Sequence, residues 1–337
     1  MRKIRVGLNG FGRIGRAFTR ISFGSENSYE VVAINTAKSK PEIMSHLLKY
    51  DSVYRRSDLD VAFTEKGLLI NSKNVVCSNE KDPNLISWGS NDVDLVLDCS
   101  GAFKTEDELS LHLRDSVKRV VISAPSSDPK IPHIVLGVNS DGFDFSQKII
   151  SNASCTTNCI APMLWVLEKE LGIENCFFVT NHAYTSSQAL LDEASKNPQR
   201  SRAAALNIIP TTTGAASAVS KIIPSLTSKI AGDALRVPVP VGSITQVYAN
   251  LHHSTNSEDL NSLYKKYSKG LLSEILAYED TPLVSSDYIG SSFSVVIDGN
   301  YTKVISESFV SVTGWYDNEW GYSSRLVDLV NILAQKI

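Results

Sequence analysis

The chain has 337 residues, 42% of them hydrophobic and 20% charged, which is enough for two globular domains that each bury a core. Its formal net charge of -3 excludes a global field that attracts nucleic acid or an anionic membrane, and no apolar run approaches the roughly 18 residues of a transmembrane helix. Five cysteines without framework spacing, and an N-terminus that runs straight into a strand pattern, predict a cytoplasmic protein without a secretory signal. No His/Cys pair matches Cys155 and Cys159, so we predict no metal site.

The first pattern along the chain is typical of a dinucleotide site. A short apolar strand, Ile4–Leu8, leads into the glycine motif Gly10–Gly15, a helical stretch to Phe23 and a second strand, Val31–Ile34. The glycines permit a tight turn, and the helix N-terminus then meets a pyrophosphate. A glycine-rich turn alone would be the simpler reading, but the strand–helix–strand context favours a cofactor.

Three further strands are predicted in the first half, at 93–99, 119–123 and 134–138. Ser100 and Ser123 follow the first two. An open parallel sheet binds its ligand at the carboxyl ends of its strands, so both serines become candidate cofactor residues.

The end of the second strand bears on cofactor preference. NAD-binding folds usually place an acid there to hold the ribose 2′-hydroxyl, but this chain has Asn35 and Thr36, with Lys38 and Lys40 close behind. Thr36 does not repel a 2′-phosphate, and either lysine could neutralise one. Alternatively, the lysines are solvated and Asn35 alone serves the ribose. The pattern favours NADP modestly.

The stretch Ser151–Asn158 surrounds Cys155 with hydroxyl and amide side chains. The apolar run Ile160–Leu171 has helical spacing and Gly172 ends it, so Cys155 lies at or just before a helix N-terminus. The helix dipole there favours a thiolate, which is a strong nucleophile for a carbonyl carbon. A buried structural cysteine is the alternative.

A predicted strand beginning at Phe177 carries His182 near its end. Beside a nucleophilic cysteine, a neutral imidazole is a natural general base near pH 7. On its own, the histidine would more often be structural.

Two later motifs suit phosphate. Thr213 and Gly214 open a predicted helix, and Arg236 lies beside a strand, where a guanidinium provides a bidentate fork. An ordinary N-cap and a surface salt bridge are the alternatives. The long stretch 186–207 predicts a functional loop or an interface. Strands at 244–251, 293–297 and 309–315 and a last helix at 322–336 complete the pattern.

Five motifs together resemble phosphorylating glyceraldehyde-3-phosphate dehydrogenase. They are GLNGFGRIGR at 7–16, SNASCTTNC at 151–159, TTGAA at 212–216, LRVP at 235–238 and WYDNEWGY at 315–322. The resemblance extends from about residue 4 to 333, and its cysteine motif is specific to this family and its near relatives.

The resemblance implies a role for each matching residue. Cys155 is the expected nucleophile and His182 the expected base. The expected cofactor-binding residues are Gly10, Phe11, Gly12, Arg13, Ile14, Asn35, Thr36, Ser100, Ser123 and Asn318. The expected substrate- and phosphate-binding residues are Ser154, Thr156, Thr185, Thr213, Gly214 and Arg236.

The chain departs from the family pattern at four places. Ser187 stands where Asp or Thr is frequent, Val241-Gly242 replaces a frequent Asn-Val pair, and Thr36 replaces Asp. Glu193-Ala194 replaces the Leu-Pro pair of strictly NAD-dependent members. The loss of Asp and of Leu-Pro resembles the NADP-using branch, although Glu193 is not that branch's usual residue.

We therefore predict an α/β protein with a Rossmann-type doubly wound parallel sheet and an α+β catalytic domain with a mixed sheet. The predicted domains are 1–153 for the dinucleotide and 154–317 for catalysis, with a C-terminal helix at 318–337 packing back on the first domain. The resemblance implies reversible, phosphorylating oxidation of glyceraldehyde 3-phosphate with NAD or NADP and inorganic phosphate, in glycolysis or gluconeogenesis, by a cytoplasmic homotetramer. Neither a nucleic acid nor a membrane partner is predicted. The alternatives are an erythrose-4-phosphate dehydrogenase and a non-catalytic nucleotide-binding scaffold.

Overall fold

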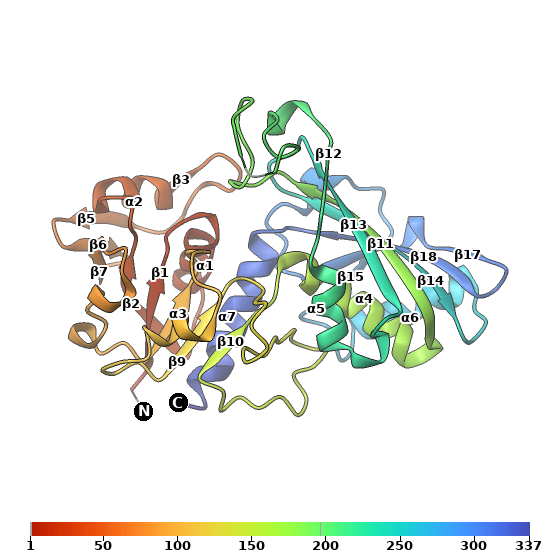
Figure 1. The fold of residues 1–337 in the computed structure, drawn as a ribbon, viewed down its shortest axis with the longest axis horizontal. Helices are drawn as coiled ribbons and strands as arrows, with labels where there is room; N and C mark the ends of the chain where they lie inside the picture. Colours follow the sequence, from red (N-terminus) through yellow and green to blue (C-terminus); the bar gives the residue numbers. More distant parts are fainter. Residues whose placement is uncertain (1, 196) are drawn as a thin grey trace. The chain divides into compact units, whose positions relative to one another are not determined.

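The computed structural model describes residues 2–195 and 197–337 (Figure 1). The chain divides into two compact units. Unit 1 comprises residues 1–134, 142–153 and 323–337, and unit 2 comprises residues 135–141 and 154–322. Within the described ranges, no helix is long and apolar enough to cross a membrane.

Unit 1 is built on one eight-stranded sheet. Its spatial order is β10 (Ile149–Ser151), β9 (Arg119–Ile122), β8 (Leu95–Asp98), β1 (Ile4–Asn9), β2 (Tyr29–Asn35), β7 (Lys73–Ser78), β6 (Gly67–Ile70) and β5 (Val61–Thr64). The six strands from β10 to β7 are parallel, and β6 and β5 extend the sheet in antiparallel fashion. The strands β8 and β9 are apolar and buried almost throughout, as expected for parallel strands covered on both faces. The predicted doubly wound sheet is confirmed.

The strand order places a ligand site at one edge of this sheet. The strand β1 lies between β2 and β8, so the connections leave it in opposite directions. Ligands of open α/β sheets bind at such a switch point, beside the carboxyl ends of the strands. Asn9, Asn35 and Asp98 end these three strands.

Four helices belong wholly or mainly to unit 1. They are α1 (Arg13–Gly24), α2 (Pro41–Lys49), α3 (Glu106–Ser110) and α7 (Trp320–Ala334), and a two-stranded ribbon joins β3 (Tyr50–Asp51) to β4 (Arg55–Arg56). The capping box of Thr105 and Glu108 starts α3. Asn331 on α7 donates to Asn27 Oδ1 at 2.8 Å and accepts from Ser28 N at 2.9 Å, so the last helix is fixed to the α1–β2 connection.

The strand predicted at 134–138 is wrong. Apart from one bridge between His133 and Ser151, this apolar run forms turns. Val138 N donates to Val135 O at 3.1 Å, and Val135 N donates to the side chain of Asn139 at 2.8 Å. The run is apolar because Ile134 and Val135 are buried, and burial alone does not separate a strand from a packed turn.

Unit 2 is built on a mixed sheet. Its main spatial order is β12 (Ile209–Thr211), β13 (Ile230–Val237), β11 (Ile173–Ala183), β14 (Ser243–Leu251), β18 (Phe309–Tyr316), β16 (Val295–Asp298) and β15 (Leu276–Glu279), and β17 (Lys303–Ile305) also pairs with β18. The strands β11 and β13 run parallel, whereas β14 pairs antiparallel with both β11 and β18. In β11, residues 176, 178, 180 and 182 are buried and alternate with more exposed neighbours.

The helices of unit 2 are α4 (Cys155–Leu171), α5 (Ala215–Ile222) and α6 (Ser257–Ser268). The long apolar helix α4 lies against β14, β16 and β18 and also contacts α5 (Figure 1). Most of its residues are buried, and Gly172 ends it with a φ of 65°, as the sequence predicts. Pro162 lies inside the helix, because α4 begins at Cys155.

Candidate active site

The nucleophile candidate is the first residue of α4. Ser154 caps this helix: its Oγ accepts from Thr157 N at 3.0 Å. The preceding Ala153 is fully buried and has a φ of 54°, in the left-handed region that an alanine rarely adopts. This turn directs the chain into α4 and leaves Cys155 partly exposed at the positive end of the helix dipole.

The structure brings Cys155 and His182 together. The Sγ of Cys155 lies 3.4 Å from Nε2 of His182, a buried residue near the end of β11. In the parallel pairing of β11 with β13, His182 is the register partner of Arg236. Strand register therefore places the predicted base beside a predicted phosphate ligand, and an arginine–histidine contact was not among the sequence predictions.

A close triangle of atoms surrounds the other nitrogen of the imidazole. Nδ1 of His182 lies 2.6 Å from Ala183 O and 2.6 Å from Nη1 of Arg236, and that Nη1 donates to Ala183 O at 2.8 Å. The ring of Tyr316 meets the imidazole edge to face, with 6.1 Å between ring centroids. Both ring nitrogens of His182 thus face polar partners.

The electrostatics of the Cys155–His182 pair differ from the sequence prediction that the helix dipole favours a thiolate. Burial raises the pKa of the Cys155 thiol, while the Arg236 charge and hydrogen bonds from Thr156 act to lower it. Burial, followed by the like charge of Arg236, lowers the pKa of His182 to about 3, although its contact with Ala183 O acts in the opposite direction. In this arrangement, the pair near pH 7 is a neutral thiol beside a neutral imidazole.

Tyr316 is a site residue that the sequence analysis missed. Its hydroxyl lies 3.2 Å from Thr156 Oγ1 on α4 and 3.0 Å from Thr180 Oγ1 on β11. These contacts join the helix of the nucleophile to the strand of the base. The only sequence signal was its position in the WYDNEWGY motif.

The predicted phosphate ligands lie on four segments of unit 2: the start of α4, the turn after β11, the start of α5 and the strand β13. Thr185 Oγ1 contacts Ser187 Oγ at 2.9 Å in the turn after β11, and Thr213 Oγ1 accepts from Ala215 N at 3.2 Å at the start of α5. Nε of Arg236 is buried and makes no hydrogen bond to any described residue, so the guanidinium retains a donor for an anion. Arg200 donates twice to Thr211 Oγ1, at 2.9 and 2.7 Å, and its charge acts on both Arg236 and His182.

The glycine motif in unit 1 has the geometry of a phosphate cradle. Gly10 has a φ of 100°, and a Cβ there would lie 2.6 Å from Ser100 N. A Cβ on Gly15 would lie 2.4 Å from Gly10 O. Gly12 caps α1 without a side-chain hydrogen bond among the described residues, and the first turn has no acid. This backbone fits a dinucleotide pyrophosphate, with Phe11, Arg13 and Ile14 adjacent.

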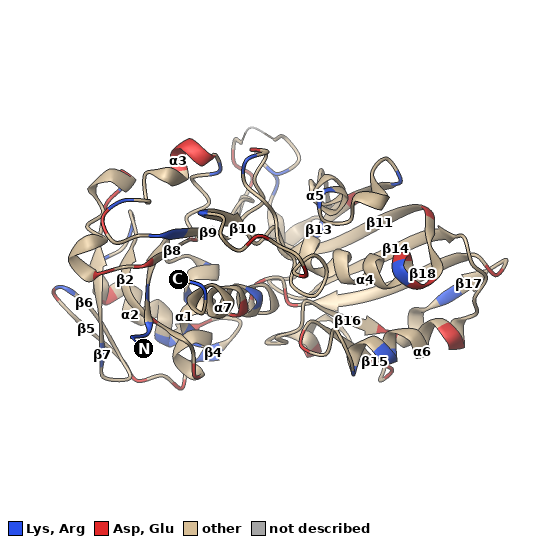
Figure 2. Cartoon of the chain, turned by 90° about the horizontal axis from the view of Figure 1, so that it is seen from below, with Lys and Arg blue, Asp and Glu red and all other residues tan. Residues whose placement is uncertain are grey.

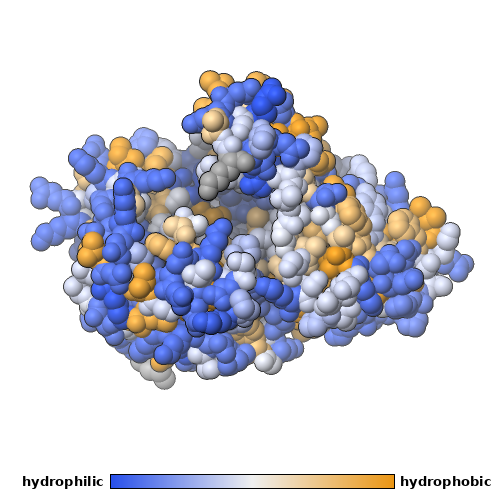
Figure 3. All heavy atoms as spheres, viewed as in Figure 1, coloured by the Kyte–Doolittle hydropathy of each residue, from blue (hydrophilic) through white to orange (hydrophobic). Residues whose placement is uncertain are grey.

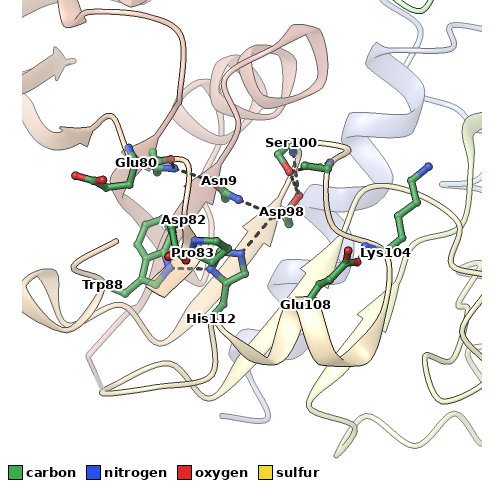
Figure 4. Close-up of polar contacts among 12 residues, drawn as sticks. Asn9, Glu80, Asp82, Pro83, Trp88, Asp98, Ser100, Lys104, Glu108 and His112 are labelled. Carbon is green, nitrogen blue, oxygen red and sulfur yellow. Dashed lines mark hydrogen bonds and ion pairs between the residues drawn. The ribbon is translucent and has the colours of Figure 1, made fainter. Parts of the chain in front are cut away.

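A buried polar network joins the ends of β1, β2 and β8 (Figure 4). Asn9 Nδ2 donates to Asp98 Oδ2 at 2.6 Å, and Ser100 donates from N and Oγ to Asp98 Oδ1 at 2.9 and 2.7 Å. His112 Nε2 lies 3.4 Å from Asp98 Oδ2, while its Nδ1 accepts from Trp88 at 3.1 Å. Directly after the neighbouring β9, Ser123 N donates to Asp98 O at 2.9 Å. The network fixes the loop that carries Ser100.

Asn35 uses its whole side-chain amide within this network. Its Nδ2 donates to Asn9 Oδ1 at 2.8 Å and to Glu80 O at 2.9 Å. Its Oδ1 accepts from Ser78 Oγ and Glu80 N, both at 2.9 Å. An amide offers two donors and two lone pairs, so a ribose hydroxyl would have to displace one of these contacts.

Thr36 is buried and its N donates to Ser78 O at 3.0 Å, whereas Lys38 and Lys40 are exposed. A carboxylate is therefore absent from the position that usually holds the ribose 2′-hydroxyl.

Asn318 lies in unit 2 and is held by Gly242, from the pair that departs from the family pattern, and by the following Ser243. Its Oδ1 accepts from Gly242 N at 3.3 Å and from Ser243 Oγ at 3.0 Å, so its Nδ2 is the group available to a carboxamide. Gly242 has a φ of 92°, and a Cβ there would lie 2.5 Å from Ser285 O. This departure therefore has a structural reason in this chain.

Comparison with known proteins gives full-length matches. Residues 4–106 match the NAD binding domain of glyceraldehyde 3-phosphate dehydrogenase, and residues 154–318 match its C-terminal domain. The chain is 43% identical to glyceraldehyde-3-phosphate dehydrogenase 2 of Bacillus subtilis, covering 99% of this chain and 98% of the relative. It is 44% identical to the Geobacillus stearothermophilus enzyme, covering 99% of each, and 42% identical to the chloroplastic enzyme A of Chlamydomonas reinhardtii, covering 99% and 90%.

Proposed function

The chain belongs to the glyceraldehyde-3-phosphate dehydrogenase family and has that activity, and on this premise we propose which of its residues perform each step. The observation that carries the assignment is the 3.4 Å contact between Cys155 Sγ and His182 Nε2 at the N-terminus of α4. A nucleophile within reach of a base, with helix amides beside it, is the arrangement that covalent acyl chemistry requires.

In the first step, Cys155 Sγ bonds to C1 of glyceraldehyde 3-phosphate while the thiol proton passes through His182 Nε2 to the carbonyl oxygen. The resulting hemithioacetal gives its hydroxyl proton to Nε2 and becomes a thioester as C1 loses a hydride, which NAD or NADP would accept when bound. An oxygen of inorganic phosphate then attacks the thioester, the C–S bond breaks, and the imidazolium returns its proton to Sγ. The product is 1,3-bisphosphoglycerate, and the reverse reaction uses the same groups.

We assign the substrate phosphate to Thr185 and Arg236, and inorganic phosphate to Ser154, Thr156, Thr213 and Gly214. The unpartnered Nε of Arg236 supports the first assignment. The start of α5 at Gly214 supports the second, because helix N-termini attract anions.

Unit 1 contains the NAD-binding domain, and we propose that it also accepts NADP. The neutral Thr36 and the exposed Lys38 and Lys40 support this extension. Asn318 is proposed to orient the nicotinamide amide through its Nδ2. The fully used amide of Asn35 supports a structural role for that residue at the adenosine end.

We also propose a homotetramer in the cytoplasm. Leu190, Leu191, Leu206 and Ile208 are exposed by 81, 73, 78 and 65%, which favours burial against a second copy of the chain. Apolar residues are visible on the surface of the projecting part of unit 2 in the space-filling view (Figure 3). Lys and Arg positions are interspersed with Asp and Glu positions along each unit (Figure 2). The five free cysteines agree with a reducing compartment. Sedimentation of the wild type and of Leu191→Asp tests the assembly, and we expect the variant to dissociate.

Steady-state kinetics with NAD and NADP, each with and without inorganic phosphate, tests the proposed chemistry. Turnover should require phosphate, because the thioester otherwise accumulates; a thioester that hydrolyses rapidly without phosphate would instead indicate erythrose-4-phosphate dehydrogenase chemistry. Cys155→Ser should abolish turnover while cofactor binding persists. If the variant retained a tenth of the wild-type kcat, the activation free energy would have risen by only about 1.4 kcal/mol, and Cys155 would be excluded as the nucleophile.

A further inference from the structure

Nδ1 of His182 is placed so that it can satisfy only one of its two close neighbours. It lies 2.6 Å from both Ala183 O, an acceptor, and Arg236 Nη1, a donor. A protonated Nδ1 can donate to Ala183 O but then opposes an N–H of the guanidinium. A deprotonated Nδ1 can accept from Arg236, and Arg236 still donates to Ala183 O at 2.8 Å.

The state of Nδ1 determines what the other nitrogen can do. In a neutral imidazole, one nitrogen carries the proton and the other accepts. When Nδ1 accepts from Arg236, the proton is on Nε2 and points toward Cys155 Sγ, 3.4 Å away. In that tautomer, Nε2 cannot take a proton from the thiol or from the hemithioacetal hydroxyl.

We propose that Arg236 is a tautomer switch for the catalytic base, and that binding of the substrate phosphate operates it. With Arg236 on Nδ1, the base is blocked. When a phosphate draws the guanidinium away, Nδ1–H donates to Ala183 O and the Nε2 lone pair faces Cys155. Arg236 is thus a positioning residue for His182, in addition to its proposed role as a phosphate ligand, on which this inference rests.

Three observations support the switch. The register of β11 with β13 pairs His182 directly with Arg236, so the contact is built into the sheet. The Arg236 Nε has no hydrogen bond among the described residues, so an anion gains a contact when it attracts this side chain. Cys155 contacts Nε2, Tyr316 meets the ring edge to face and the charge of Arg200 acts on the imidazole, so none of these three groups competes for Nδ1.

The inference predicts that the phosphate of the substrate contributes to acylation rate as well as to binding. An aldehyde without phosphate leaves the base blocked, so glyceraldehyde should acylate Cys155 slowly even at saturation. A separate oxyanion in the same site should restore the rate. Because a general base is worth about 10² to 10⁴ in rate, we expect phosphite to accelerate acylation by glyceraldehyde about 10²-fold.

Nitrogen NMR reads the tautomer directly. The full-length protein, saturated with NAD and labelled with ¹⁵N in its six histidines, would be titrated at pH 7 with glycerol 1-phosphate, a phosphate monoester that lacks the aldehyde, and His182→Asn would identify the His182 signals. We expect a proton on Nε2 before the titration and on Nδ1 after it. In Arg236→Leu, His182 should carry its proton on Nδ1 throughout the titration. Arg2→Gln, which alters an exposed arginine paired with Asp94, should behave like the wild type.

Calorimetry on the same samples separates the two levels of the proposal. Phosphate binding without a change of tautomer would overturn the switch while leaving Arg236 as a phosphate ligand. Equal affinity of the wild type and Arg236→Leu for glycerol 1-phosphate would remove that ligand role and the switch with it. The switch would also be overturned if His182 of the wild type carried its proton on Nδ1 before the titration. The same conclusion would follow if phosphite did not change the single-turnover burst with glyceraldehyde. Thermal unfolding of Arg236→Leu checks its fold, and the wild-type titration does not depend on that variant.

Discussion

The hydroxyl of Tyr316 lies 3.2 Å from Oγ1 of Thr156, the residue directly after the proposed nucleophile. Both residues are buried, so neither oxygen can exchange this partner for bulk water. The same hydroxyl reaches Thr180 on the strand of His182. One phenol therefore holds together the two elements whose separation sets the 3.4 Å distance from thiol to imidazole.

Removing this hydroxyl should cost both stability and activity. Tyr316→Phe removes the buried hydrogen bonds of the phenol to Thr156 and Thr180, although Thr180 Oγ1 still donates to Ile244 O at 3.4 Å, so we expect a loss of about 1–3 kcal/mol of unfolding free energy. Urea unfolding measures that loss, and kcat should fall as the helix and strand loosen. Tyr301→Phe is the matched control, because Tyr301 is 55% exposed and surface changes are usually within about 0.5 kcal/mol. Equal stabilities of the two variants would contradict the role of Tyr316.

Alkylation should distinguish Cys155 from the other cysteines. Burial raises the pKa of Cys77 to about 11 and of Cys99 and Cys176 to about 12, and it also raises the pKa of Cys159. A raised thiol pKa means less thiolate at pH 7.5, and reactivity returns only as the pH rises toward that pKa. Burial raises the pKa of Cys155 as well, but there the Arg236 charge opposes it.

We therefore expect brief iodoacetamide treatment at pH 7.5 to modify Cys155 first. Peptide mass spectrometry locates the label, and Cys155→Ser serves as the control. Label appearing at Cys77 or Cys99 at the same rate would show that Arg236 and the end of α4 do not favour reaction at Cys155.

Asn35 should behave as a structural residue. Asn35→Ala removes four hydrogen bonds at the ends of β1 and β2, so the unfolding free energy should fall by at least about 2 kcal/mol. NAD and NADP should be affected equally. Asn74→Ala, on the exposed part of β7, is the control. A large loss of NAD affinity with unchanged stability would instead make Asn35 a ribose ligand.

Thr36→Asp should shift the cofactor preference toward NAD. The new carboxylate can accept the 2′-hydroxyl and repels a 2′-phosphate. The measurement is kcat/KM for NADP divided by kcat/KM for NAD, which we expect to be near or above one in the wild type and to fall in the variant. Lys38→Ala and Lys40→Ala, made separately, show which lysine meets the phosphate. A wild type that strongly prefers NAD, with a ratio indifferent to Thr36→Asp, would contradict the NADP proposal.

Local signals account for what the sequence predicted correctly. The glycine motif, the apolar parallel strands and the helical spacing after Cys155 are short-range patterns, and the structure confirms β1, α1, β2 and α4. His182 lies near the end of its strand and Gly214 at the start of α5, as predicted.

Long-range pairing accounts for what the sequence analysis missed. The extension by β5, β6 and β7 depends on β7 pairing with β2, which no local pattern specifies. The contact of Arg236 with His182 depends on register between strands 54 residues apart. The four hydrogen bonds that occupy the Asn35 amide and the two contacts of the Tyr316 hydroxyl likewise require partners that only the fold brings together.

The pairing of His182 with Arg236 also limits which insertions and deletions this chain can tolerate. Side chains alternate across a strand, so a one-residue insertion or deletion within β11 or β13 would turn one of the two residues to the opposite face of the sheet. A second insertion or deletion in the same strand would be needed to return that residue to its original face. Insertions and deletions among descendants of this chain should therefore avoid both strands and occur in surface connections. The proposed catalytic role of the His182–Arg236 pair then constrains the length of these strands in addition to any constraint from stability.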